Sequence, residues 1–177
     1  MNTEKIRFRL AFITIGSLFL GIFIGTNLTK FGLENYMYNT SESLPEKLFK
    51  IEDSDGTINK GDYISFCPTK KILQPMIDMK IARKSSECLL GYEPHLKIVG
   101  AVENDYLRVK DDGIYVNGIK IRSDLRPYYD YLSQFKYDGI VPKNMMFVYG
   151  TNEKSYDSRY YGFISKDKII KKVKPVF

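Results

Sequence analysis

A long apolar stretch without a charged residue lies near the amino terminus of the chain. It runs from Leu10 to Thr29 and is rich in Leu, Ile and Phe. At about 1.5 Å of rise per residue, a helix of this length matches a bilayer core of roughly 30 Å. The pattern therefore predicts a transmembrane helix at residues 10–29. A cleaved signal peptide is the alternative, but the run is longer than a usual apolar core of 7–15 residues, and Gly25-Thr26-Asn27 is a poor cleavage site.

Basic residues precede this stretch. Lys5, Arg7 and Arg9 stand against a single Glu4, and an excess of Lys and Arg favours the cytoplasmic side of a membrane. The charge pattern predicts a cytoplasmic tail at residues 1–9 and an extracytoplasmic domain at residues 30–177.

The remaining pattern is that of a mainly β domain, with short apolar and β-branched segments separated by turn residues. A type I′ turn is favoured at Asn117-Gly118, because both residues tolerate positive φ. A short helix is expected between Pro75 and Arg83, and residues 123–143 are expected to be an irregular insertion. Strands are predicted near residues 61–66, 96–102, 107–109, 114–116, 119–121 and 145–149, with an apolar stretch at residues 48–51 and a final strand or turn near 163–164.

Net charge and histidine content bear on whether the protein binds nucleic acid or a metal ion. The formal charge is +6, which suits an anionic membrane surface or nucleic acid, but the sequence has no nucleic-acid motif and we expect no such partner. The chain has one histidine, which excludes a multi-histidine metal site. We expect neither a metal nor another cofactor.

Four segments carry candidate chemistry. Taken alone, a serine in a polar loop or a lysine is usually a turn or surface residue. In this order, and over nearly the whole chain, the segments resemble the signal peptidase I family, and most closely its conjugative-transfer (TraF-type) branch. They are residues 39–45 (Asn-Thr-Ser-Glu-Ser-Leu-Pro), 61–64 (Gly-Asp-Tyr-Ile), 96–105 (beginning Leu-Lys-Ile-Val-Gly) and 155–163 (Ser-Tyr-Asp-Ser-Arg-Tyr-Tyr-Gly-Phe).

The resemblance implies a signal-peptidase-like antiparallel β domain behind one N-terminal transmembrane helix, and a serine protease with a Ser-Lys dyad. Ser43 would be the nucleophile and Lys97 the general base. A neutral amine can take the serine proton, and an apolar strand favours the neutral form of lysine. By the same resemblance, Ser41 would donate to the oxyanion and Ser155 would orient the lysine amine.

Further roles follow from the resemblance. Asp157 and Arg159 would form a supporting ion pair, although a surface pair of little energetic value is an equal alternative. Leu44 and Leu96 would line a pocket for a small substrate side chain.

Four departures from the family pattern are visible, and they concern fine geometry and substrate preference. One is a loop before Ser155 that is one residue short, and the other three are substitutions. Lys47 stands where Gly is usual, Ile98 stands where Arg is frequent, and Glu103-Asn104-Asp105 replaces Pro-Gly-Asp. Asn can substitute for Gly at positive φ. The single histidine, His95, shares a strand face with Lys97, so a histidine-based triad is the competing mechanism.

Cys67 and Cys88 enclose a loop of about twenty residues. The conjugative branch carries a cysteine pair at this place, and an extracytoplasmic location permits a disulfide. Two free thiols are the alternative.

The resemblance implies cleavage of an exported preprotein, such as a pilin precursor, by an enzyme of the inner (plasma) membrane that contacts membrane lipid. A housekeeping signal peptidase I is one alternative. A non-catalytic, membrane-anchored assembly factor of a secretion apparatus is another.

Overall fold

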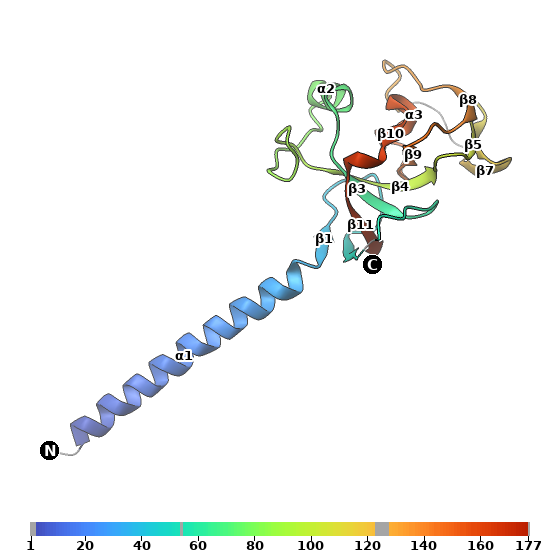
Figure 1. Cartoon of the computed structure of the whole chain (residues 1–177). Coiled ribbons are helices and arrows are strands. Elements are labelled where there is room, and N and C mark those ends of the chain that lie inside the picture. Colours follow the sequence, from blue (N-terminus) through green and yellow to red (C-terminus); the bar gives the residue numbers. More distant parts are fainter. Residues whose placement is uncertain (1–2, 54, 123–127, 177) are drawn as a thin grey trace. The chain divides into compact units, whose positions relative to one another are not determined.

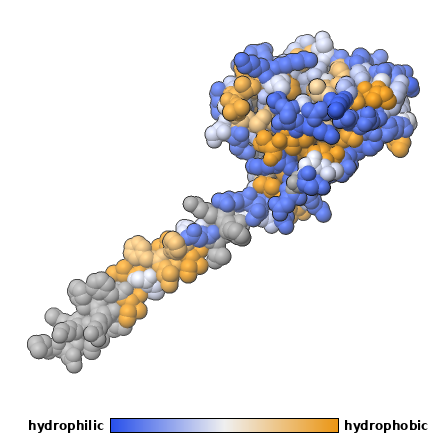
Figure 2. All heavy atoms as spheres, in the orientation of Figure 1, coloured by the Kyte–Doolittle hydropathy of each residue, from blue (hydrophilic) through white to orange (hydrophobic). Residues whose placement is uncertain are grey.

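A computed structural model of the chain describes residues 3–53, 55–122 and 128–176; in the first helix, side chains are described at residues 13–27 and 32. The chain divides into two compact units, Met1–Met37 and Tyr38–Phe177. The first unit is mainly the helix α1 (Thr3–Leu33; Figure 1). Its described apolar side chains are exposed (Figure 2). Residues 10–12, 28 and 29 of the predicted span, and the basic residues before it, have side chains outside the described set.

Over the described residues, no helix combines the length and hydropathy needed to cross a bilayer.

The second unit contains a larger antiparallel sheet. Its last strand in sequence lies between two of the earliest, so the carboxyl-terminal segment completes the sheet (Figure 1). This strand was not predicted from the sequence, because it is rich in lysine and buries mainly Val173. After β1 (Tyr36–Tyr38), at the boundary of the two units, the order is β2 (Leu48–Glu52), β11 (Ile169–Pro175), β3 (Tyr63–Phe66), β4 (His95–Ala101), β9 (Met145–Tyr149) and β10 (Ile164–Ser165).

A smaller antiparallel sheet has the order β7 (Ile119–Arg122), β6 (Gly113–Val116), β5 (Tyr106–Lys110) and β8 (Tyr137–Ile140). Asn117 has φ 51° and Gly118 has φ 81°, so the predicted turn with two positive φ angles is confirmed. Strand β8 lies where an irregular insertion was predicted, and that prediction is wrong for residues 137–140. Its Asp138-Gly139 pair has low β propensity, and pairing with β5 holds it in the sheet. Residues 123–127 of the predicted insertion lie outside the described residues.

The helices of the second unit are α2 (Lys70–Asp78), α3 (Ser158–Tyr161) and the 3₁₀ helix η1 (Lys166–Lys168). Helix α2 lies earlier than predicted and contains Pro75 in its interior. An interior proline sacrifices a helix hydrogen bond, but α2 buries Ile72 and Leu73, and this burial favours the helix.

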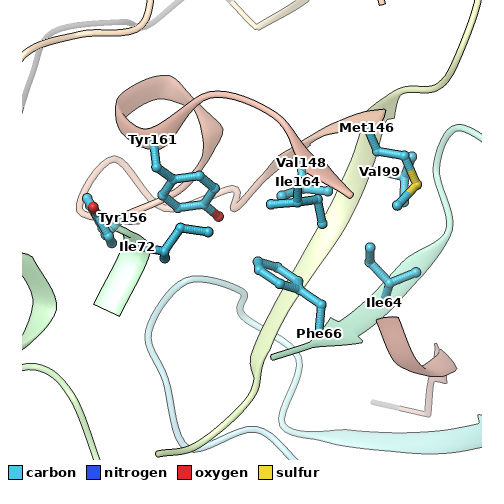
Figure 3. Close-up of a cluster of buried hydrophobic side chains, with 9 residues drawn as sticks. All are labelled: Ile64, Phe66, Ile72, Val99, Met146, Val148, Tyr156, Tyr161 and Ile164. Atoms are coloured by element: carbon cyan, nitrogen blue, oxygen red, sulfur yellow. The ribbon is translucent and has the colours of Figure 1, made fainter. Parts of the chain in front are cut away.

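Two clusters of buried side chains form the core. The first packs one face of the larger sheet against α2 and α3, and includes Phe66, Ile72, Val99 and Tyr161 (Figure 3). The second fills the space between the two sheets, around Leu107 and Phe147. Along β4, His95 and Lys97 share the face of Val99, because side chains alternate along a strand. Lys97 therefore points toward the first cluster.

The mainly β fold predicted from the sequence is confirmed.

Candidate active site

The first part of the site is a loop at residues 39–47, called here the Ser43 loop. Asn39 organises it from within and is 4% exposed. Its Oδ1 accepts from the Ser41 N–H (3.0 Å) and the Ser41 hydroxyl (2.9 Å). Its Nδ2 donates to the carbonyl oxygens of Leu44 (3.2 Å) and Glu46 (2.9 Å). One buried amide side chain thus ties the two ends of the loop together.

Asn39 was missed as a functional candidate in the sequence. The available signal was weak: an asparagine two residues before a serine is typical of an Asx turn. The bonds to Leu44 and Glu46 are specific to the folded loop.

Ser41 and Ser43 lie together in this loop. The Ser43 N–H donates to Ser41 Oγ at 3.4 Å, and the Ser41 hydroxyl itself donates to Asn39. Lys47 Nζ donates to the Ser41 carbonyl oxygen at 3.1 Å. Lys47, which stands where the family usually has glycine, therefore ties the end of the loop to its middle.

Lys97 comes to the Ser43 loop from β4. Its Nζ lies 2.8 Å from Ser43 Oγ, within hydrogen-bond reach, and 3.2 Å from the carbonyl oxygen of Leu96. The lysine is 4% exposed, and β4 is held between β3 and β9. Ser43 in its loop and Lys97 on β4 stand 54 positions apart in the sequence, and the fold brings their side chains into direct contact.

The surroundings of Lys97 favour its neutral form. Burial lowers the pKa of the Lys97 amine to about 8, while the negative charge of Asp157 opposes this shift and the positive charge of Arg159 assists it. Burying a charged amine disfavours the protonated state, because the interior solvates the charge poorly. A substantial fraction of Lys97 is therefore neutral near pH 8, unlike an ordinary surface lysine.

His95 does not occupy the position of a base for Ser43. Its ring packs edge-on against Phe66, with centroids 5.4 Å apart. Neither imidazole nitrogen has a hydrogen-bond partner among the described residues. Burial, with a smaller effect of Lys97, lowers the pKa of His95 to about 3. Ser43 Oγ has its contact with Lys97, and the geometry gives the histidine-based mechanism no support.

A second loop, residues 150–157 (the Gly150 loop), lies against the Ser43 loop. The Asn152 N–H donates to the Ser43 carbonyl oxygen at 3.2 Å. The Gly150 N–H donates to Asp157 Oδ2 at 3.0 Å, so the carboxylate holds the loop at its far end.

Asp157 and Arg159 form a buried, two-pronged ion pair. Arg159 Nε lies 2.8 Å from Asp157 Oδ1, and Nη2 lies 2.9 Å from Oδ2. The side chains are 0% and 6% exposed. Arg159 Nη2 also donates to the Ser155 carbonyl oxygen at 2.8 Å. The surface-pair alternative does not describe this geometry, since a buried pair with further hydrogen bonds is a fixed part of the fold.

Ser155 stands in the same loop with a buried hydroxyl. Within the described part of the chain, its Oγ has no hydrogen-bond partner, so the predicted contact with the Lys97 amine is not made in this structure. The hydroxyl faces Gly150, where a β-carbon would overlap Ser155 Oγ and lie 2.6 Å from the Ser43 carbonyl oxygen. Gly150 therefore lies between Ser155 and the Ser43 loop, and its lack of a side chain lets the two approach each other.

Leu44 and Leu96 are both buried, with 1% and 6% exposure. Each is the chain neighbour of a candidate catalytic residue.

Cys67 and Cys88 form a disulfide with Cα atoms 5.6 Å apart, which confirms the predicted pairing. The segment that they enclose, and the residues just after it, reach the Ser43 loop. Arg83 Nη1 donates to the Thr40 carbonyl oxygen at 3.1 Å, and the Thr40 hydroxyl donates to Glu93 at 3.2 Å. The cross-linked segment thus braces Thr40, three residues before Ser43.

Asn104 has φ 71°, which agrees with its predicted ability to replace glycine there. In the described ranges, no group of three or more His, Cys, Asp or Glu side chains is arranged to hold a metal ion.

Comparison with known proteins identifies the family of the chain. The family model for signal peptidase, peptidase S26, matches residues 7–177. The chain belongs to this family.

Relatives lie in both branches of the family. A conjugal transfer protein TraF of Agrobacterium tumefaciens is 23% identical over 95% of this chain and 94% of its own length. A plasmid transfer protein TraF of Escherichia coli is 29% identical over 78% of this chain and 80% of its own. A signal peptidase I of Bacillus caldolyticus is 26% identical over 88% of this chain and 85% of its own. A solved signal peptidase I from Enterococcus faecalis is 19% identical with a TM-score of 0.41, covering 67% of this chain and 97% of that one.

Proposed function

We propose that this protein is a serine endopeptidase in which Ser43 is the nucleophile and Lys97 the general base. The observation that carries the proposal is the 2.8 Å contact between Ser43 Oγ and the buried Lys97 Nζ. Burying a lysine amine is unfavourable and serves no packing purpose that Leu or Met would not serve better. An amine placed against a serine hydroxyl has the geometry that proton transfer requires.

The chemistry proceeds through an acyl-enzyme. Neutral Lys97 takes the hydroxyl proton as Ser43 Oγ attacks the scissile carbonyl carbon. The tetrahedral intermediate collapses, the C–N bond breaks, and the protonated Lys97 gives its proton to the leaving amine. A water molecule, deprotonated by Lys97, then attacks the ester and the bond between the acyl carbon and Ser43 Oγ breaks. Lys97 returns the proton to Ser43 Oγ, and the new carboxyl terminus is released.

The negative charge on the carbonyl oxygen would be stabilised by the Ser43 N–H and the Ser41 hydroxyl. These donors lie in one loop, in which Asn39 holds Ser41 and the Ser41 hydroxyl contacts the Ser43 N–H. Both make internal contacts now, and the 3.4 Å contact of the Ser43 N–H is a weak one. A substrate oxyanion would draw both donors away from these partners, because bonds to a charged acceptor are stronger.

The remaining residues have supporting roles in this proposal. Asp157 and Arg159 fix the conformation of the Gly150 loop, which contacts the Ser43 loop through the Asn152 N–H. The Ser155 hydroxyl, buried and without a partner among the described residues, is available to orient the Lys97 amine. Leu44, the buried neighbour of Ser43, is the stronger candidate to line a pocket for a small substrate side chain, because Leu96 lies on the face of β4 opposite to Lys97.

The substrate is an exported preprotein, and relatives named for conjugal and plasmid transfer favour a transfer protein such as a pilin precursor. A housekeeping signal peptidase I is the second candidate, favoured by the relative of that name. A non-catalytic assembly factor would have no need of a buried lysine against Ser43.

The proposed location is the inner membrane, with residues 10–29 as a single anchor and residues 30–177 outside. The uncharged run and the basic residues before it support this topology. Protease added to intact spheroplasts should digest the outer domain. Digestion that occurs only after lysis would refute the topology.

Precursor cleavage by the purified full-length chain tests the catalytic proposal. Ser43→Ala and Lys97→Arg should both be inactive, since arginine keeps its proton. Ser41→Ala should lose about 10²–10³ in rate, and His95→Ala should keep most activity. Normal cleavage by Lys97→Arg together with an inactive His95→Ala would overturn the dyad in favour of a histidine base.

A further inference from the structure

A cluster of tyrosines lies beside the candidate active site, and neither the proposed mechanism nor the core accounts for its exposed part. The tyrosine cluster comprises Tyr128, Tyr129, Tyr131, Tyr156 and Tyr160. Tyr129 is its centre, with its ring centroid 5.0–6.3 Å from those of the other four in edge-on arrangements. Tyr128 and Tyr131 remain 49% and 68% exposed. Ordered tyrosines that face solvent are typical of binding surfaces.

The Gly150 loop connects this cluster to Ser43. Within the loop, the Asn152 N–H donates to the Ser43 carbonyl oxygen. Two residues further on, the Lys154 carbonyl oxygen accepts from the Tyr129 hydroxyl at 3.2 Å. Tyr156 continues the same loop into the cluster. The tyrosines are therefore fixed within one short loop of the reacting hydroxyl.

Glu42 provides a negative charge next to Ser43 in the sequence. It is the residue before Ser43, it is exposed, and its carboxylate has no ion-pair or hydrogen-bond partner in the part of the chain that the structure describes. Glu42 is joined to Ser43, whose carbonyl oxygen accepts from the Asn152 N–H, and two residues further on the Lys154 carbonyl oxygen accepts from the Tyr129 hydroxyl. The pKa of Tyr129 is raised mainly by burial, with smaller effects of neighbouring tyrosines and of the Glu42 charge.

The cluster already accepts a cation in this fold. Lys154 Nζ lies over the Tyr128 ring, 5.3 Å from its centroid. Tyrosine faces attract ammonium and guanidinium groups through the negative charge of the ring face. An exposed carboxylate on the loop that adjoins these rings would favour one ligand class, an extended cationic side chain.

We propose that Glu42 and the exposed face of the tyrosine cluster form a specificity site for a lysine or arginine of the substrate within three residues of the scissile bond. The inference rests on the proposed peptidase function and adds a preference that the Ser-Lys dyad and its small-residue pocket do not supply. The carboxylate binds the charged end, and the Tyr131 and Tyr129 rings lie along the aliphatic stem.

The experiment measures kcat/KM of the purified full-length chain on a peptide series. Each peptide places lysine at one position, from three residues before the scissile bond to three after it, and its partner carries norleucine, an uncharged residue of similar length. We expect the lysine-to-norleucine ratio of kcat/KM to rise about threefold to tenfold at one position, the range that an exposed ion pair and a cation–π contact supply.

Variants then assign the preference. Glu42→Gln should bring the ratio toward one, and the distant Glu52→Gln should leave it at the wild-type value. Tyr131→Leu should reduce the ratio, whereas Tyr131→Phe, which keeps the ring, should retain it.

The outcomes separate this inference from the peptidase proposal. Wild-type cleavage with a ratio within twofold of one at every position overturns the specificity site and leaves the peptidase intact. A fall of both peptides by the same factor in Glu42→Gln assigns Glu42 a structural role and also overturns it. Absence of cleavage of every peptide and of the precursor contradicts the peptidase proposal itself.

Discussion

Gly150 and Ser155 face each other so closely that position 150 has no room for a side chain. A β-carbon there would overlap Ser155 Oγ, and on the other side it would lie 2.6 Å from the Ser43 carbonyl oxygen. A serine hydroxyl can rotate away, but a backbone carbonyl cannot move without moving the loop that carries Ser43. The Ser43 loop and the Gly150 loop can therefore lie this close only because residue 150 is glycine.

Gly150→Ala should displace Ser43 from Lys97 and lower kcat by about 10² or more, since displacements near 1 Å have effects of that size. Gly139→Ala is the matched control, because the nearest atom to its new methyl group would be 3.6 Å away, at ordinary contact distance. Steady-state kinetics on the precursor peptide measures both. Equal activity of the two variants would contradict the proposed coupling of the loops.

The pH dependence of cleavage should report the Lys97 amine. The base acts only when neutral, and its pKa is about 8. We expect kcat/KM to rise with pH, to reach half its maximum near pH 8, and to fall about tenfold per pH unit well below it. His95, with a pKa of about 3, is neutral throughout this range. A midpoint near the ordinary histidine value of about 6.5 would instead indicate a histidine base.

Lys97→Met should abolish cleavage and stabilise the fold. The unfolded lysine has a pKa of 10.5 and the folded one about 8, so below pH 8 the folded state carries an unfavourable buried charge. Wild-type stability therefore rises with pH between these two values, where the unfolded chain binds more protons. Methionine removes a penalty on the order of 3 kcal/mol at pH 7.

Urea unfolding of the purified chain in detergent, at pH 7 and again above pH 10, measures this effect. The advantage of Lys97→Met should shrink at the higher pH, while the exposed Lys71→Met should change little at either. Lower stability of Lys97→Met than wild type at pH 7 would contradict the role of burial.

Asn39→Ala should reduce both stability and turnover, because the carbonyl oxygens of Leu44 and Glu46 lose their donor and Ser41 loses its acceptor. Buried groups left without partners cost about 1–3 kcal/mol each. We expect kcat to fall more than KM rises, since the Ser41 hydroxyl would no longer be positioned. Asn59→Ala, at an exposed site, is the control. A pure loss of stability with unchanged kcat would show that Asn39 does not position the donors.

Loss of the Cys67–Cys88 disulfide should destabilise the domain by on the order of 3 kcal/mol, the value for a loop of this length. The double variant Cys67→Ser/Cys88→Ser should also cleave more slowly. Arg83, inside the cross-linked segment, and Glu93, just after it, both form hydrogen bonds with Thr40 in the Ser43 loop. Alkylation of the exported protein under denaturing, non-reducing conditions should label neither cysteine. Full labelling of both would mean that the disulfide does not form in the cell.

Local signals in the sequence predicted the elements that depend on local physics. The hairpin at Asn117-Gly118 formed where expected, because positive φ is a property of those two residues. Strands β3, β4 and β9 follow from short apolar runs. By contrast, β8 and β11 are held by their partners in the sheets, so their own residues gave no clear signal.

For the site, the sequence alone determined which groups are available: two serines before Leu44-Pro45, one lysine on an apolar strand, and a single histidine beside it. Only the tertiary structure decided that Ser43 meets Lys97 rather than His95. It also decided that Asp157 and Arg159 are buried together and that Asn39 holds the Ser43 loop. The reason is physical. A side chain's identity fixes what it can donate or accept, but its pKa, partners and exposure depend on distant segments that only folding brings together.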